Sequence, residues 1–268
     1  VMQLIKENDA MSKQARTVLV TAGASGIGWH TAKGFLAQGA QVHICDNSAA
    51  AIAAMAKEEP DITATLADAA SVSEVNRVFE EIKNLYGGLD VLVNNVGISG
   101  PTAAMEDIEV EAWNQTINVN LNSLFYVTRL AIPLLKRSSG QIVNMASNAG
   151  LYGCPLRSPY VAAKWAMIGL TKTLAMELGD HGIRVNAVCP GSVAGPRIDR
   201  VIENDAISRG VSEAEIRAAY LTQSSMGDFI NAEDIAQTIL FLCSDSAKHI
   251  SGQAIPIDGH TESLSTRP

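Results

Sequence analysis

A short apolar run that leads into a glycine-rich turn limits the fold of this chain more than any other feature. Thr17-Val-Leu-Val-Thr21 is followed at once by Ala22-Gly-Ala-Ser-Gly-Ile-Gly28 and then by a helical pattern near 27–38. An apolar run this short is typical of a strand covered on both faces, as in parallel sheets. Glycines allow a pyrophosphate to come close to the backbone, and the start of a helix offers N–H groups. The segment therefore predicts a dinucleotide-binding strand and helix.

Apolar runs and helical patterns continue to alternate along the chain. Further strands are expected over 41–45, 62–66, 89–93, 141–145, 183–188 and 254–258. Helices are expected over 48–58, 71–85, 109–120, 122–137 and from Tyr160 to about 178. This order predicts an α/β protein of the Rossmann type, with a doubly wound parallel sheet of seven strands flanked by helices. Ligands bind such sheets at the carboxyl ends of the strands.

The chain is expected to form one domain. Residues 1–14 lack the apolar core of a signal peptide, and we expect a disordered N-terminal extension there. Residues 15–268 contain no linker rich in proline or serine and are expected to be a single dinucleotide-binding domain. The long departure is 194–229, with helical patterns over 199–207 and 212–220. An excursion of this size in a compact domain predicts a substrate lid.

Charge and cysteine spacing exclude several classes of partner. The net charge is −8 and the pI is near 5.1, which disfavours nucleic acid and anionic membranes. No run of eighteen apolar residues occurs, so no transmembrane helix is expected. The cysteines are far apart and show neither metal-ligand nor redox spacing: Cys45, Cys154, Cys189 and Cys243. We expect buried thiols in a cytoplasmic protein without a metal.

Asp46 predicts which dinucleotide is bound. It stands eighteen residues after Gly28, at the end of the second expected strand. A carboxylate there accepts hydrogen bonds from the adenosine ribose and repels a 2′-phosphate. Ala24, Ser25 and Asn47 offer no positive charge to pair with such a phosphate. The sequence therefore favours NAD over NADP, with a helix N-cap as the alternative role of Asp46.

Two other strand ends carry polar side chains. Asp68 follows the third strand, where it either accepts from an adenine amino group or caps the next helix. Asn94-Asn-Val-Gly97 ends the fourth strand. Small and amide residues there either brace the backbone beside the cofactor or form a polar turn.

Tyr160, Lys164 and Ser147 indicate the chemistry. Tyr160 and Lys164 are four residues apart, and Ser147 lies thirteen residues before the tyrosine. Positions i and i+4 share one face of a helix, so the ammonium can lie beside the phenol. Free tyrosine titrates near pH ~10, and only a nearby positive charge favours the phenolate at neutral pH. Beside a nucleotide-binding turn, these groups indicate hydride transfer on an alcohol or carbonyl.

Together these motifs resemble the short-chain dehydrogenase/reductase family, in its short single-domain branch. The resemblance covers 17–258 and rests also on Val119-Asn-Leu121 and Pro190-Gly191. It implies that Tyr160 is the general acid/base, that Lys164 lowers its pKa and holds the nicotinamide ribose, and that Ser147 orients the substrate oxygen. It also implies that Asn120, rather than Asn118, holds a water that links Lys164 to solvent.

The motifs and the resemblance together give a set of expected cofactor contacts. They are Gly23, Ser25, Gly26, Ile27, Gly28, Asp46, Asp68, Asn95, Val96, Gly97, Tyr160, Lys164, Pro190, Gly191 and Val193. The family is usually tetrameric, and wide apolar stripes on 114–137 and 158–178 fit a homotetramer or dimer, with a buried internal face as the alternative. Three residues depart from the family pattern: Ala22 and Gly195 replace a usual glycine and threonine, and His260 ends Asp258-Gly-His.

The expected function is an NAD-dependent oxidoreductase acting on CH–OH groups, which interconverts a secondary alcohol and a ketone. Its substrate is expected to be small and polar or hydroxylated, in contact with Ser147, Asn148, Tyr152, Arg157 and Arg197. Arg197 and Arg200 either meet an acidic substrate group or pair with a local acid such as Asp199 or Glu203. A 3-oxoacyl-carrier-protein reductase is an alternative, against which Asp46 and the acidic charge argue. A non-catalytic NAD sensor is another, against which the presence of Tyr160 and Lys164 argues.

Overall fold

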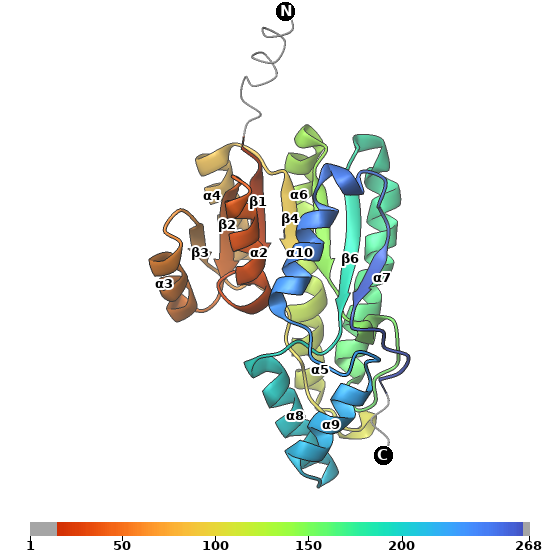
Figure 1. Cartoon of the computed structure of the whole chain (residues 1–268). Coiled ribbons are helices and arrows are strands. Elements are labelled where there is room, and N and C mark those ends of the chain that lie inside the picture. The colour runs from red at the N-terminus through yellow and green to blue at the C-terminus, as the bar shows by residue number, and fades with distance from the viewer. Residues whose placement is uncertain (1–14, 265–268) are drawn as a thin grey trace, which may run out of the picture.

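The computed structural model describes residues 15–264, and the extension expected over 1–14 lies outside them. In these residues seven strands form one parallel sheet in the order β3-β2-β1-β4-β5-β6-β7 (Figure 1). The strands are β1 (Thr17–Thr21), β2 (Gln41–Asp46), β3 (Thr63–Leu66), β4 (Val91–Asn94), β5 (Gln141–Met145), β6 (Arg184–Pro190) and β7 (Ala254–Ile257). The strand order reverses between β1 and β4. The predicted doubly wound sheet of seven strands is confirmed, and this switch point is where such sheets bind ligands.

Helices cover both faces of the sheet. They are α2 (Gly26–Ala37), α3 (Ala49–Glu58), α4 (Val72–Tyr86), α5 (Val110–Ile117), α6 (Ser123–Ser138), α7 (Ser158–Leu178), α8 (Pro196–Arg209), α9 (Glu213–Thr222) and α10 (Ala232–Leu242). Helices α2 and α10 pack side by side over one face, and α4, α6 and α7 lie over the other (Figure 1). Helices α8 and α9 project beyond the carboxyl ends of the strands.

The alternation of side chains along each strand produces two cores. In β1, Val18 and Val20 are fully buried against Phe35 of α2 and Ile239 of α10. Leu19, between them, is buried on the opposite face among residues of α4 and α6. Side chains in a strand point alternately to the two faces, so a run buried at every position requires cover on both sides. This explains why the strands read as continuous apolar runs.

Helix α10 is an addition to the expected elements, because no helix was predicted over 230–253. Its buried residues Ile235, Ile239 and Leu242 follow the helical spacing i, i+4, i+7. The Asp234 carboxylate accepts a hydrogen bond from the Asn231 N–H at 3.2 Å, as in a capping box. Both the spacing and the cap are signals that the sequence carries.

The segment predicted as a lid leaves the sheet and returns to it at neighbouring points. Val193 and Ile230 form a parallel bridge, so the two ends of the excursion lie side by side. Between them, α8 and α9 pack on each other around a small core of their own that includes Ile202 and Ile216. The excursion is thus a separate layer beyond the sheet. No helix among the described residues is long and apolar enough to cross a membrane.

Candidate active site

A cavity of about 560 Å³ opens between the carboxyl ends of the strands and the lid. Its walls come from the glycine turn, the loops after β4, β5 and β6, helix α7 and helices α8 and α9. The predicted site residues that line it are Ser25, Gly26, Ile27, Asn95, Gly97, Ser147, Asn148, Arg157, Tyr160, Lys164, Pro190, Gly191, Val193 and Arg197. Segments more than 170 residues apart in the chain therefore meet in one cavity.

The other predicted residues lie outside this lining: Gly23, Gly28, Asp46, Asp68, Val96, Asn120 and Tyr152. Tyr152, expected to touch the substrate, is half-buried, and its carbonyl accepts from the Trp165 ring N–H at 3.4 Å. Val96 donates its N–H to the Thr21 hydroxyl at 3.3 Å. Gly23 and Gly28 belong to the glycine turn, Asp46 and Asp68 stand at the ends of β2 and β3, and Asn120 lies between α5 and α6.

Tyr160 and Lys164 lie on one face of α7, as the spacing predicted. The Lys164 Nζ is 5.6 Å from the centroid of the Tyr160 ring. The ammonium is buried and donates to the Met145 carbonyl, at the end of β5, at 2.6 Å. Ser147 follows β5 and lines the same cavity as Tyr160, and its hydroxyl lowers the pKa of Tyr160. The phenol, the ammonium and the serine hydroxyl therefore meet in the cavity.

The surroundings of Tyr160 favour its phenolate. Burial alone raises the pKa of Tyr160, and it is the largest single influence. The positive charges of Lys164, Arg197 and Arg157 and the hydrogen bond from Ser147 together outweigh burial, so the pKa lies below the usual 10.0. Burial lowers the pKa of Lys164 to about 8 against the opposing effect of Tyr160, so the ammonium is still protonated at neutral pH. Opposite charges within a few ångströms stabilise each other's ionised forms.

Asn120 lies in a π-helical turn, Asn118–Asn122, that joins α5 to α6. The sequence predicted two helices that meet here, and the structure instead continues the helix through a wider turn. The Asn120 side chain is fully buried, accepts from the Ile98 N–H at 2.8 Å and donates to the Ile98 carbonyl at 3.0 Å. Only Gly97 separates it from Lys164: a Cβ on that glycine would lie 2.9 Å from the Asn120 Oδ1 and 3.5 Å from the lysine Nζ. Such turns are common at functional sites.

The glycine turn fits a dinucleotide pyrophosphate. Ser25 precedes α2, but its side chain makes no capping hydrogen bond, so the first N–H groups of the helix have no side-chain partner. Ser25, Gly26 and Ile27 line the cavity. Gly28 packs so closely that a Cβ would lie 2.2 Å from the Ala22 carbonyl oxygen. An uncapped helix start beside a tight turn is a binding site for phosphate groups.

Ala22 keeps the turn despite its side chain. Its φ is +50°, in the left-handed region that a glycine would enter without cost. A non-glycine residue there costs roughly 1 kcal/mol. The departure from the family pattern therefore introduces local backbone strain at Ala22.

Asp46 ties the end of β2 to the glycine turn. One carboxylate oxygen accepts from the Ala24 N–H at 3.1 Å, and the other accepts from the Ser48 N–H at 3.0 Å. The helix cap itself is Ser48, whose hydroxyl accepts from the Ala51 N–H. A carboxylate has about four acceptor sites, so both oxygens keep capacity for a ribose hydroxyl. The cap role weighed as an alternative for Asp46 thus belongs to Ser48.

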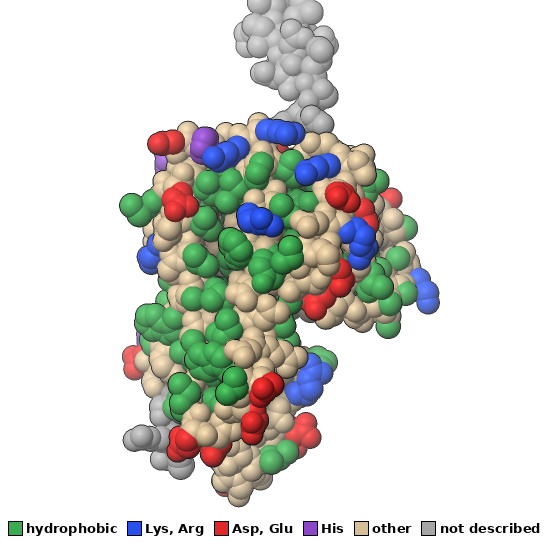
Figure 2. All heavy atoms as spheres, turned by 180° about the vertical axis from the view of Figure 1, so that it is seen from behind, with side chains coloured by type: hydrophobic (Ala, Val, Ile, Leu, Met, Phe, Trp, Pro, Cys, Tyr) green, Lys and Arg blue, Asp and Glu red, His purple; other side chains and the backbone are tan. Residues whose placement is uncertain are grey.

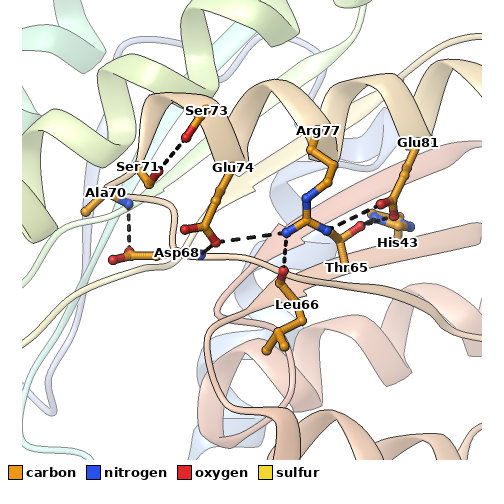
Figure 3. A network of polar contacts seen from close by, with 10 residues as sticks. All are labelled: His43, Thr65, Leu66, Asp68, Ala70, Ser71, Ser73, Glu74, Arg77 and Glu81. Carbon is orange, nitrogen blue, oxygen red and sulfur yellow. Dashed lines mark hydrogen bonds and ion pairs between the residues drawn. The ribbon is translucent and has the colours of Figure 1, made fainter.

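Asp68 starts a polar network that extends to the buried His43 (Figure 3). One Asp68 carboxylate oxygen accepts a hydrogen bond from the Ala70 N–H at 2.9 Å. The backbone N–H of Asp68 donates to the Glu74 carboxylate. The other members are Arg77, which contacts Glu74, Glu81 and the Leu66 carbonyl, and Thr65, which links Glu81 to His43. The network fixes the loop after β3. The second Asp68 oxygen has no partner among residues 15–264, so the adenine contact stays a prediction.

The two departures near the lid have structural roles. Gly195 has a φ of +127°, which side chains rarely adopt, and it immediately precedes α8. The usual threonine would be strained at this turn into the lid. His260 contacts the lid from the other side, with its Nδ1 2.7 Å from the Ser225 hydroxyl. The chain after β7 is therefore tied to the segment that follows α9.

The lid end of the cavity is rich in arginine. Arg157, Arg197, Arg200 and Arg209 all line it, with Asp205, Tyr220 and Gln223. Helical patterning predicted the lid helices, but Asp205, Arg209, Tyr220 and Gln223 were not among the predicted site residues. The local ion pairs expected for Arg197 and Arg200 are not formed, because Asp199 instead contacts Arg217 at 2.6 Å.

Comparisons with known proteins find relatives over almost the whole chain. The model of a family described as enoyl-(acyl carrier protein) reductase matches residues 21–260. The chain is 36% identical over 254 residues to the 3-oxoacyl-(acyl-carrier-protein) reductase FabG of Thermotoga maritima, covering 93% of this chain and 98% of that protein. It is 35% identical over 258 residues to the D-beta-hydroxybutyrate dehydrogenase of Rhizobium meliloti, covering 91% of this chain and 97% of that protein.

A solved structure is similar over almost the whole chain. It is a single-substitution variant of the actinorhodin polyketide ketoreductase with NADPH, with a TM-score of 0.88 and 30% identity over 92% of this chain and 97% of that one. Fold, site and relatives define an oxidoreductase that uses a nicotinamide cofactor and acts between alcohols and ketones. The chain belongs to the short-chain dehydrogenase/reductase family, as its motifs predicted.

Proposed function

We propose that the protein is an NAD-dependent dehydrogenase that oxidises a small, polar secondary alcohol to a ketone, and reduces the ketone in reverse. The observation that supports this most is the meeting of Tyr160, Lys164 and Ser147 in a cavity that also reaches the glycine turn. A bound nicotinamide would accept or supply the hydride. We propose that Ser147 and Tyr160 hold the substrate oxygen between them.

In the oxidative direction the Tyr160 phenolate takes the hydroxyl proton of the substrate while the carbinol hydride leaves. The substrate loses two electrons with the hydride, and its proton stays on the phenol. The positive charge of Lys164 stabilises the Tyr160 phenolate. Gly97 has no side chain, so the Lys164 ammonium and the Asn120 amide both come close to its backbone. General base catalysis of this kind contributes about 10²–10⁴-fold. A panel of secondary alcohols with NAD and with NADP, followed by nicotinamide absorbance, tests the function.

We propose NAD as the cofactor because of Asp46. Its carboxylate lies beside the glycine turn, and a 2′-phosphate there would meet a negative charge. Asp46→Asn keeps an acceptor oxygen for the turn and removes the charge. We expect kcat/KM for NAD to fall and the preference for NAD over NADP to shrink about 10–100-fold, the worth of hydrogen bonds to a charged group.

The control for this variant is its unfolding temperature, because Asp46 also accepts hydrogen bonds from Ala24 and Ser48. An unchanged cofactor preference in a folded variant would remove Asp46 from cofactor selection. A wild-type preference for NADP would contradict the proposal outright.

A second candidate is the reduction of a 3-oxoacyl thioester, since the Thermotoga maritima relative is a 3-oxoacyl-(acyl-carrier-protein) reductase. Such an enzyme would have to bind an acidic carrier, and this chain has a net charge of −8. NADPH-dependent reduction of a 3-oxoacyl substrate faster than any alcohol oxidation would favour this candidate.

We propose that the protein is a cytoplasmic homotetramer. Large apolar side chains are exposed on α5, α6 and α7: Val110, Phe125, Trp165 and Met176. Figure 2 shows hydrophobic side chains gathered on the face opposite α2 and α10. Burying them between copies would remove this apolar surface from water. Gel filtration with light scattering should give four times the 28.4 kDa chain mass, and a monomer would contradict the proposal.

A further inference from the structure

The charges on the cavity walls are unbalanced. Four arginines line the cavity, and Asp205 is the only Asp or Glu side chain in the same lining of described residues. That acid is already engaged, since the Arg209 Nε lies 2.5 Å from the Asp205 Oδ1. The positive charge of Arg157, Arg197 and Arg200 is therefore not neutralised by the cavity's own side chains.

Arg157 is the most confined of these cations. It is only 8% exposed, and its Nη2 donates to the Ser99 carbonyl at 2.8 Å. Its guanidinium carbon lies 5.2 Å from the centroid of the Tyr160 ring. The Nε has no hydrogen-bond partner in the part of the chain that the structure describes. No carboxylate of residues 15–264 forms an ion pair with this cation. A buried cation that no carboxylate pairs with is costly, which points to a ligand that brings a negative charge.

Arg197 faces the same space from the lid. It lies in the first turn of α8, and its charge acts on both Tyr160 and Lys164. Neither Arg197 nor Arg200 forms an ion pair with any residue of 15–264. Two acids of that helix are paired with other arginines: Asp199 with Arg217 of α9, and Asp205 with Arg209. The two walls of the cavity thus offer cations beside the groups that handle the substrate oxygen.

We propose that the substrate is a short hydroxy acid whose carboxylate, within a few bonds of the reacting carbon, is held between Arg157 and Arg197. This rests on the proposed function and specifies its substrate class. Oxidation turns the CH–OH carbon into a ketone, with the hydride passing to NAD and the proton to Tyr160. The carboxylate takes no part in the reaction and leaves with the 2- or 3-oxo acid.

A carboxylate suits these groups better than a neutral polar group does. An arginine and a carboxylate form charge-assisted hydrogen bonds, and the planar fork of the guanidinium matches the two oxygens. Such a contact would also fix the alcohol relative to Ser147 and Tyr160, since both ends of a short molecule are held. Removing one charged partner typically lowers affinity about 10–100-fold.

The test compares acids with their amides. Wild-type enzyme is assayed with NAD on lactate, 3-hydroxybutyrate and longer hydroxy acids, and on the corresponding amides, which keep the alcohol and lose the charge. We expect a preference for the acids of at least about 10-fold in kcat/KM. In Arg197→Met this preference should fall about 10-fold, whereas Arg197→Lys should keep most of it.

Arg197 also affects the pKa of Tyr160, but this effect cancels in the ratio of kcat/KM for an acid to kcat/KM for its amide, because both substrates use the same base. Arg137→Met is the control: it removes an exposed arginine at the end of α6 that does not line the cavity. Its ratio should equal that of the wild type. The KM for NAD should not change in Arg197→Met, and an increase would assign that arginine to the cofactor phosphates instead.

The results separate the inference from the proposed function. Oxidation of neutral alcohols without a preference for the acids, or a ratio unaffected by Arg197→Met, overturns the inference and leaves the dehydrogenase in place. If neither acids, amides nor other secondary alcohols are turned over in a Tyr160-dependent way, the proposed function itself is wrong. An acid preference that Arg197→Met removes supports both.

Discussion

Tyr160→Phe should lower kcat for alcohol oxidation by about 10²–10⁴-fold, to near the background rate. The variant loses only the hydroxyl that exchanges the proton and keeps the ring between Arg157 and Lys164. Neither the glycine turn nor Asp46 is touched. Binding of NAD, measured by calorimetry, should therefore remain within a few-fold of the wild type. Steady-state rates with the best alcohol from the panel measure the effect.

Ser147→Ala is the matched comparison for this prediction. It removes a hydroxyl that lowers the pKa of Tyr160 but leaves the phenol in place, so a smaller loss is expected. A Tyr160→Phe enzyme with wild-type kcat would show that the proton leaves the substrate by another route. Loss of NAD binding in the same variant would instead show that the phenol is mainly a cofactor contact.

Lys164→Met should lower kcat/KM at neutral pH by about 10²-fold or more, and the loss should shrink as the pH rises. Alcohol oxidation needs the phenolate, so the rate rises as the pH increases through the pKa of Tyr160. Lys164 lowers the pKa of Tyr160, and burial raises it. When Lys164 is removed, the effect of burial is less opposed, so the pKa of Tyr160 rises. The rising limb of the pH–rate profile should therefore move to higher pH, and a profile of kcat/KM measures this.

Removal of Lys164 should also weaken cofactor binding, and the same experiment separates this loss from the change in the pKa of Tyr160. The lysine is also expected to hold the nicotinamide ribose, and KM for NAD reports that loss at every pH. A reduced rate with an unshifted pH profile would confine the lysine to cofactor binding. Because Lys164 is buried and donates to the Met145 carbonyl, the thermal stability of the variant must be checked as well.

The fold was predictable because its signals are local. Each strand of the sheet is a short apolar run, and the helices between strands have their own spacing of apolar side chains. Connections between parallel strands are right-handed, which leaves few ways to arrange such a chain. Helix α10 was not predicted, although its spacing and its Asn231–Asp234 cap are equally local. Its signals are therefore as readable in the sequence as those of the other helices.

The catalytic pair was predictable for a similar reason. Tyr160 and Lys164 share a helix, so their spacing alone sets them side by side. The π-helical turn at Asn120 was not predictable, since it depends on the buried contact between its amide and the Ile98 backbone. Spacing along a helix says nothing of such a contact from another segment.

The charge balance of the lid could not be read from the chain either. Arg197 and Arg200 stand beside Asp199 in the sequence, which favoured local ion pairs. In the structure Asp199 contacts Arg217, from the next helix, and the two arginines line the cavity. Which acid pairs with which arginine is decided by how α8 packs on α9. That packing depends on side chains far apart in the chain.

The most direct test of the central claim is an ultraviolet titration of Tyr160, taken as the difference between the wild type and Tyr160→Phe. We expect this phenol to ionise below pH 10, and we expect Lys164→Met to raise its pKa. A Tyr160 pKa at or above the ~10 of free tyrosine, or one that Lys164→Met leaves unchanged, would contradict the role of Lys164 in stabilising the phenolate.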